Sequence, residues 1–324
     1  MNHTFCSKGT PRHTILLALL CAASAWSPSA LADLPLTVEG MLTAQNRWRA
    51  ELGINYANIE QRGVSTGQPV SIQVSATQFV NIPTQIGGAR FNSDTVVLSP
   101  GLRYGASENT ELYGRTSWLG DSTRIQGVSG TDSQYNSRFD SLWLGINHKF
   151  IEEGESPALL GFAEIAALER SYLSSVADAQ DYSGRAGLIG ATTYRVIDPI
   201  VLSFTGAYRI NAPRSINNQS YTPGNFLLLS PSLAFAVNSD ITLSAGLLWR
   251  NTRPDVINGQ DQSLLRTSTD FNLGLAWLWS ERSVLNFSSK ANLSGSGGAE
   301  LGMTWVYKLG DLPMHKHPVK EVTP

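Results

Sequence analysis

Apolar side chains recur at every second position in twelve segments of this chain, the period of a β-strand with one apolar face. The first segment runs from about Trp48 to Asn58 and the last from about Ala299 to Leu309. The alternation is clearest in the tenth, where Phe271, Leu273, Leu275, Trp277 and Trp279 take turns with Asp270, Asn272, Gly274 and Ala276. The chain therefore reads as a series of amphipathic strands.

The connections between these segments alternate in length. Short gaps such as Asn238–Asp240 and Ser280–Arg282 take turns with long polar ones such as Asn211–Asn225 and Arg250–Gln262. A membrane-spanning β-barrel has tight turns on one side, long loops on the other and an even number of strands. We therefore predict an all-β fold: a transmembrane antiparallel up-and-down barrel of about twelve strands over residues 47–309, in the bacterial outer membrane.

The strand faces opposite the apolar ones are expected to line the interior. Two assignments are less direct than the others. The segment beginning near Ala158 permits either phase, and Glu164 is taken as inward. In the segment before Asp198-Pro199, the residues taken as outward are Leu188, Gly190, Thr192 and Tyr194. The predicted pore-lining residues are Arg49, Glu51, Arg103, Glu111, Arg115, Lys149, Glu164, Arg185, Arg195, Arg209, Asp270, Lys290 and Glu300.

Cations predominate in this inward set, and two interpretations follow. An inner wall biased towards cations would favour anionic or polar solutes. Alternatively, the charges pair across the interior and stabilise a nearly closed barrel. The sequence leaves both interpretations open.

The N-terminus has the features of a secretory signal peptide over residues 1–32. A basic start at Lys8 and Arg12 precedes the mostly apolar stretch Ile15–Ala25, and Ala30-Leu31-Ala32 offers a cleavage site before Asp33. Residues 33–46 would then form a short periplasmic segment. Cys6 and Cys21, the two cysteines, both lie in the leader, so disulfides and thiolate chemistry are not expected in the mature chain.

Composition excludes several classes of function. The chain has 24 basic and 26 acidic residues, and removal of Lys8 and Arg12 leaves 22 against 26, a formal charge of −4. No clustered basic face points to nucleic acid. We find no phosphate loop, nucleophile elbow or metal-ligand cluster, and we take the outward-facing His148 as an interfacial residue. We therefore expect neither an enzyme nor a cofactor or metal.

The final segment resembles the insertion signal of bacterial outer-membrane barrels. Glu300, Gly302, Trp305 and Tyr307 occupy the polar, glycine and aromatic positions of that signal. The assembly machinery would recognise this strand by edge pairing, and lipid would surround the barrel. Residues 310–324 are expected to form a disordered periplasmic tail.

The segment Ile59–Asp94 is too long for a simple loop and contains its own alternation. It would either extend as a hairpin above the membrane or fold inward as a constriction. Long loops of this kind usually have a function.

With these residues in place, the chain resembles outer-membrane barrels of the meta-pathway phenol-degradation-like transporter type. It is also similar to the barrel of functional-amyloid secretion channels. The likeness rests on Leu36 to Leu42 before the first strand, and on Leu102-Arg103-Tyr104-Gly105 leading into Glu111-Leu112. The resemblance implies movement of small molecules or unfolded polypeptide across the outer membrane. The helical N-terminal region of the amyloid exporters has no counterpart here.

The leading hypothesis is an outer-membrane channel that passes small or hydrophobic solutes. The alternatives are a secretion-associated barrel that exports a peptide or surface-fibre subunit, and a non-conducting structural or adhesive barrel. Twelve strands lie between the eight of side-chain-filled barrels and the sixteen to eighteen of wide porins, which fits a narrow pore. The sequence does not identify the solute.

Overall fold

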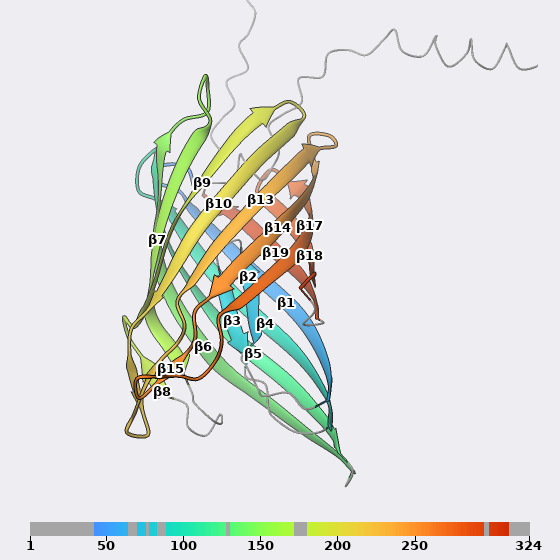
Figure 1. Ribbon diagram of the computed structural model, residues 1–324. Coiled ribbons are helices and arrows are strands. Elements are labelled where there is room, and N and C mark those ends of the chain that lie inside the picture. The colour runs from blue at the N-terminus through green and yellow to red at the C-terminus, as the bar shows by residue number, and fades with distance from the viewer. Residues whose placement is uncertain are drawn as a thin grey trace, which may run out of the picture.

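The chain forms a closed β-barrel (Figure 1). The computed structural model describes residues 42–63, 70–75, 78–82, 89–127, 130–171, 180–294 and 298–310. Neighbouring strands are antiparallel, and the pairings form one complete ring. The first strand pairs with the last from Trp48↔Leu309 to Asn58↔Ala299, and β6 pairs with β7 on the other side of the ring. The predicted twelve-stranded transmembrane barrel is confirmed. No helix within the described ranges is long and apolar enough to cross a membrane.

The barrel strands coincide with the twelve predicted segments. They are β1 (Trp48–Gly63), β4 (Ala89–Gly105), β5 (Thr110–Gly127), β6 (Gly130–Ile151), β7 (Ala158–Ser171), β9 (Ala186–Ile197), β10 (Ile200–Asn211), β13 (Phe226–Ala236), β14 (Ile241–Thr252), β17 (Arg266–Ser280), β18 (Ser283–Asn292) and β19 (Ala299–Leu309).

A continuous apolar belt covers the outside of the barrel. Outward side chains such as Leu98, Leu202 and Trp305 keep 41%, 45% and 40% of their surface exposed. No second layer of protein covers them among the described elements, so hydrocarbon is the fitting solvent for this face. The rings of Trp48 and Tyr104 lie 4.7 Å apart at the short-turn end, where an interfacial aromatic girdle belongs.

A charge in the middle of this belt should destabilise the barrel. We expect Leu98→Arg to lower the free energy of unfolding by about 2–4 kcal/mol, the usual effect of arginine on the lipid face near the bilayer midplane. Urea titration in phospholipid vesicles, followed by tryptophan fluorescence, measures the change. Tyr135→Arg is the control, because Tyr135 is 72% exposed on the β5–β6 hairpin beyond the belt. An equal loss in both variants would argue against lipid at Leu98.

Several strands run far past the membrane on the long-loop side. β5 and β6 have 18 and 22 residues and remain paired out to Gly127↔Gly130, whereas about 9–11 residues suffice to span a bilayer. The predicted alternation of short and long connections therefore fails between β5 and β6. The backbone of this region keeps strand geometry, and the two strands pair with each other.

The connections on the long-loop side carry additional strands. β8 (Gln180–Tyr182) pairs with β7, while β11 (Arg214–Ile216), β12 (Gln219–Thr222), β15 (Val256–Ile257) and β16 (Gln260–Asp261) form a small sheet. The β12–β15 pairing joins two neighbouring loops. In Figure 1 this side is the lower end, and the short turns lie at the upper end. Two loops thus form one ordered structure beside the outer mouth.

Part of the predicted segment Ile59–Asp94 is strand. β1 stays paired with β4 out to Gly63↔Ala89, well beyond the end predicted for the first strand at Asn58. Between them lies a hairpin, β2 (Val70–Ser75) and β3 (Gln78–Ile82), which contacts β1 and is drawn within the outline of the barrel in Figure 1. This placement agrees with the inward-folded alternative.

The phase predicted for β9 is wrong. The register pairs Arg195 with Leu202 and Thr192 with Thr205, and Leu202 is on the outer face. Thus Leu188, Gly190, Thr192 and Tyr194 face inward, and Arg195 faces outward. Both faces of β9 carry apolar residues, so alternation alone does not fix its orientation. Pairing across a two-residue turn does, because directly opposite residues share a face.

Three predicted segments fall largely outside the described residues. The signal peptide at 1–32 and the tail beyond Gly310 lie there, as does most of the segment 33–46. The cleavage site before Asp33 therefore stays a prediction.

Candidate functional site

The lumen contains a cavity of about 560 Å³ near the middle of the barrel. All twelve barrel strands contribute to its lining. Its volume is within the range of about 300–1,000 Å³ that is typical of small-molecule sites. The cavity is therefore a natural candidate for the functional site.

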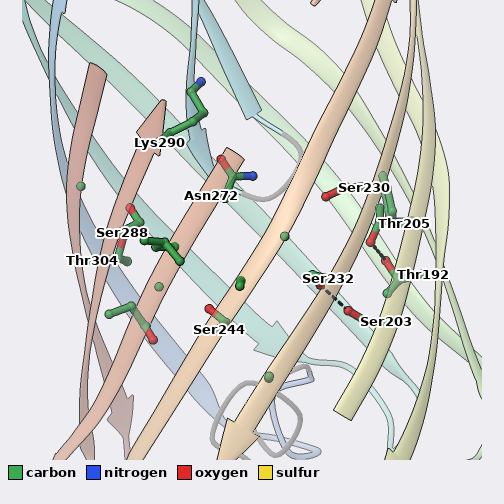
Figure 2. A pocket seen from close by; sticks show the side chains of 18 of the residues that line it. Thr192, Ser203, Thr205, Ser230, Ser232, Ser244, Asn272, Ser288, Lys290 and Thr304 are labelled. Carbon is green, nitrogen blue, oxygen red and sulfur yellow. Dashed lines mark hydrogen bonds between the residues drawn. The ribbon is translucent and has the colours of Figure 1, made fainter. Parts of the chain in front are cut away.

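Hydroxyl and amide groups form one wall of this cavity, on strands β10 to β19 (Figure 2). We call this the hydroxyl wall; its members are Ser203, Thr205, Ser230, Ser232, Ser244, Asn272, Asn286, Ser288 and Thr304, together with Thr192 on β9. Two pairs bond across neighbouring strands, Thr192 Oγ1 to Thr205 Oγ1 at 2.8 Å and Ser203 Oγ to Ser232 Oγ at 2.6 Å. These groups are polar and uncharged, and the charged lining residues of β18 and β19, Lys290 and Glu300, pair with each other.

An ion pair stands on the opposite side of the cavity. Glu164 accepts two hydrogen bonds from Arg115, at 3.0 and 2.6 Å, and a third from the Tyr113 hydroxyl at 2.6 Å. The Glu164 side chain is only 1% exposed. Pairs of this bidentate kind are rigid and directional.

The periplasmic end of the lumen is closed by the chain that precedes β1. The Thr43 amide donates to Glu111 Oε2 at 2.7 Å, and Glu111 is fully buried. Arg103 and Asn147 donate to its other oxygen at 2.8 and 2.9 Å. A side chain at Gly105 would meet the Ala44 carbonyl oxygen at 2.1 Å, so only glycine allows the chain to cross there.

An apolar layer borders the other end of the cavity along strands β6 to β14. It consists of Trp143, Ala166, Ala186, Leu188, Ala207, Phe226, Leu228 and Leu248. On each of their strands these residues lie on the long-loop side of the residues that line the cavity. The Arg115 and Arg209 guanidinium carbons lie 5.6 and 4.9 Å from the Trp143 ring centre. Apolar constrictions of this kind can gate a pore by excluding water.

Charged groups also lie on the long-loop side of the apolar layer. Glu169 is ion-paired with Arg209 on the wall and, at 2.7 Å, with Arg214 on β11. The Arg214 side chain is 2% exposed. Because Arg214 belongs to a loop and Glu169 to the barrel, this contact anchors the loop over the lumen.

The thirteen predicted pore-lining residues divide into three groups. Those that line the cavity are Arg103, Arg115, Glu164, Lys290 and Glu300. Those that face the interior on the long-loop or the short-turn side of the cavity are Arg49, Glu51, Glu111, Lys149, Arg209 and Asp270. Arg195 is on the outer face and donates to the carbonyl oxygens of Gly154 and Glu155, and Arg185 is exposed just before β9, so the prediction for these two is wrong.

The inward charges are paired rather than free. Lys290 contacts Glu300 at 2.7 Å and Asp270 at 4.0 Å, and Arg103 contacts Glu51 at 2.7 Å. Of the two interpretations left open by the sequence, this geometry agrees with pairing across the interior. Sequence reasoning missed the hydroxyl wall and the apolar layer, since neither contains a residue type that stands out alone.

The residues of the predicted assembly signal lie on the closing strand β19. Trp305 and Tyr307 point outward with rings 5.7 Å apart, and Trp305 Nε1 donates to Ser283 Oγ at 2.6 Å. Glu300 and Gly302 face the cavity. Recognition of this strand by an assembly machinery stays a prediction.

Asp181 and Tyr221 are among the groups outside the membrane whose pKa is shifted. Arg170 donates to Asp181 on β8, which holds the pKa of that carboxyl below its usual range. Burial raises the pKa of the Tyr221 hydroxyl on β12. The outer rim therefore keeps a charged Arg170–Asp181 pair and a neutral Tyr221 at neutral pH. Within the described ranges, no group of three or more His, Cys, Asp or Glu side chains is arranged to hold a metal.

Comparison with known proteins identifies the architecture. No protein-family model matches the sequence, and no curated protein does. The chain is similar in structure to an outer membrane channel from Pseudomonas putida F1, with a TM-score of 0.59, 11% identity, and coverage of 88% of this chain and 100% of that one. At this identity the likeness establishes the fold, and the barrel expected from the resemblance is confirmed.

Two further solved structures match less closely. The translocator domain of the autotransporter NalP from Neisseria meningitidis has a TM-score of 0.48 and 12% identity, with coverage of 92% of this chain and 96% of that one. The CymD monoaromatic hydrocarbon channel has a TM-score of 0.44 and 10% identity, with coverage of 84% and 90%.

Proposed function

We propose that this protein is a channel of the bacterial outer membrane that passes small solutes. The observation that carries the proposal is the cavity lined by all twelve strands inside a closed barrel with a lipid-facing belt. A barrel that served only as a scaffold would not need such a polar space.

Obstructions on both sides of the cavity give specific support to a second candidate, a non-conducting barrel. The Thr43–Glu111 contact lies on one side of the cavity and the apolar layer on the other. For a channel, this structure would be the closed state, and one of the two closures would have to move. Such opening is a shift between two populated states.

Reconstitution in planar bilayers separates the two candidates. Refolded protein should give discrete single-channel currents in KCl, with small conductance because the cavity is narrow. The same protein unfolded by heat before addition is the control. Altered migration in detergent gels shows whether the barrel is folded. If folded protein inserts into the bilayer and conducts no current, the result favours the non-conducting candidate.

A further inference from the structure

The cations that line the cavity are each neutralised by the protein itself. Arg115 is bound by Glu164, Lys290 by Glu300, and Arg103 by Glu51 and Glu111. A charged solute in the cavity would have to compete with these short contacts. The lining therefore offers little attraction to an anion or a cation.

The hydroxyl wall, in contrast, has hydrogen-bonding capacity to spare. The side-chain hydroxyls of Ser244, Ser288 and Thr304 make no hydrogen bond within the part of the chain that the structure describes. A hydroxyl can donate once and accept twice, so the bonded pairs Thr192–Thr205 and Ser203–Ser232 also retain acceptor capacity. A solute here could form many neutral hydrogen bonds.

Asn55 on β1 adds a buried amide to the lining of the same space. It is 8% exposed, it lines the cavity, and its Nδ2 atom has no hydrogen-bond partner. A side chain at Gly302 would come within 2.5 Å of both Asn55 Oδ1 and Ser288 Oγ, so this glycine keeps the space between them open. Buried polar groups without a partner are rare and call for one.

Phe162 adds an apolar surface to the lining. Its ring occupies the space that a side chain at Gly190 would fill, with the ring carbon Cζ only 2.3 Å from the position of that Cβ. Phe162 also lines the cavity. A ring beside many hydroxyl and amide groups matches molecules that carry C–H groups on one face and hydroxyls around the edge.

We propose that the cavity is a binding site for small uncharged polyhydroxylated solutes, such as polyols or monosaccharides. The proposal rests on the proposed function, because it makes this cavity the selectivity site of the channel. A hydrocarbon would leave the hydroxyl wall and Asn55 without partners. An ion would gain nothing from cations that are already paired.

The test combines ion current with solute transport. In planar bilayers with KCl, glucose or xylitol should interrupt the current in a concentration-dependent way. In proteoliposomes, glucose should enter faster than gluconate, which has similar size but carries a charge. Asn55→Leu should raise the half-saturating glucose concentration by about two- to tenfold, the effect of losing one neutral hydrogen bond.

The controls separate failure of the site from failure of the channel. Ser99→Ala changes an interior hydroxyl outside the cavity and should leave the glucose response as in the unaltered protein. Heat-dependent migration in detergent gels shows whether each variant is folded. Normal KCl current with no glucose response, or with gluconate entering as fast as glucose, overturns the binding site and leaves the channel standing. Absence of KCl current from folded protein overturns the channel itself.

Discussion

Trp143→Ala is expected to convert the closed lumen into an open one. Trp143 is 4% exposed and is the largest side chain of the apolar layer, and the guanidinium groups of Arg115 and Arg209 lie over its ring. Its removal would join the cavity to the space beneath the outer loops. We expect the single-channel conductance to rise several-fold. The free energy of unfolding should fall by about 3–5 kcal/mol, as for other buried tryptophans cut to alanine.

The control for this variant is a tryptophan on the other face of the barrel. Trp279 is 64% exposed in the aromatic girdle, so Trp279→Ala should leave the conductance unchanged. Planar-bilayer recording of both variants provides the comparison. If Trp143→Ala folds and conducts no better than the parent, the apolar layer is not the closure. The constriction would then be at Thr43 or at the β2–β3 hairpin.

Glu164→Gln is expected to change both stability and ion selectivity. The carboxylate neutralises Arg115, whose side chain is only 10% exposed, and the amide would leave that guanidinium buried without a counter-charge. Breaking one partner of a buried pair usually lowers the free energy of unfolding by about 3–5 kcal/mol. The new positive charge beside the cavity should shift the reversal potential in a KCl gradient towards chloride selectivity.

A double variant tests whether the effect passes through Arg115. Arg115→Met combined with Glu164→Gln removes both charges and should restore much of the stability and return the reversal potential towards the parent value. Glu152→Gln is the matched control, because the Glu152 side chain is 75% exposed in a short turn. A reversal potential in Glu164→Gln equal to that of the control would show that this pair does not affect ion passage.

The sequence alone predicts the orientation of a barrel strand where one face of the strand is clearly more polar than the other. In β17, Asp270 and Asn272 alternate with Phe271 and Leu273, because side chains that face lipid are apolar and those that face the lumen are polar. In β9 the alternation fails, because Leu188 packs into the apolar layer inside the barrel while Ile189 meets lipid at 60% exposure. Apolar packing within the lumen thus removes the contrast on which the prediction depends.

The candidate site is harder to predict from the sequence than the strands are. Inward charges such as Arg115 and Glu164 follow from strand phase, but their pairing depends on the register between β5, β6 and β7. The hydroxyl wall is assembled from single serines on separate strands, and only barrel closure brings them together. Thr43 precedes the first strand and shows no pattern at all, yet its amide completes the environment of Glu111.

The pairing of β1 with β19 has a consequence for biogenesis. The two strands meet from Trp48↔Leu309 to Asn58↔Ala299, so the contact joins segments that lie far apart in the sequence. Contacts between distant parts of a chain form slowly, since the loop-closure entropy must be overcome first. Until the last residues arrive, one edge of β1 and one edge of β18 have unpaired backbone groups, which in hydrocarbon is strongly unfavourable. A chain that stops short of residue 299 should therefore be unable to insert into the bilayer as a closed barrel.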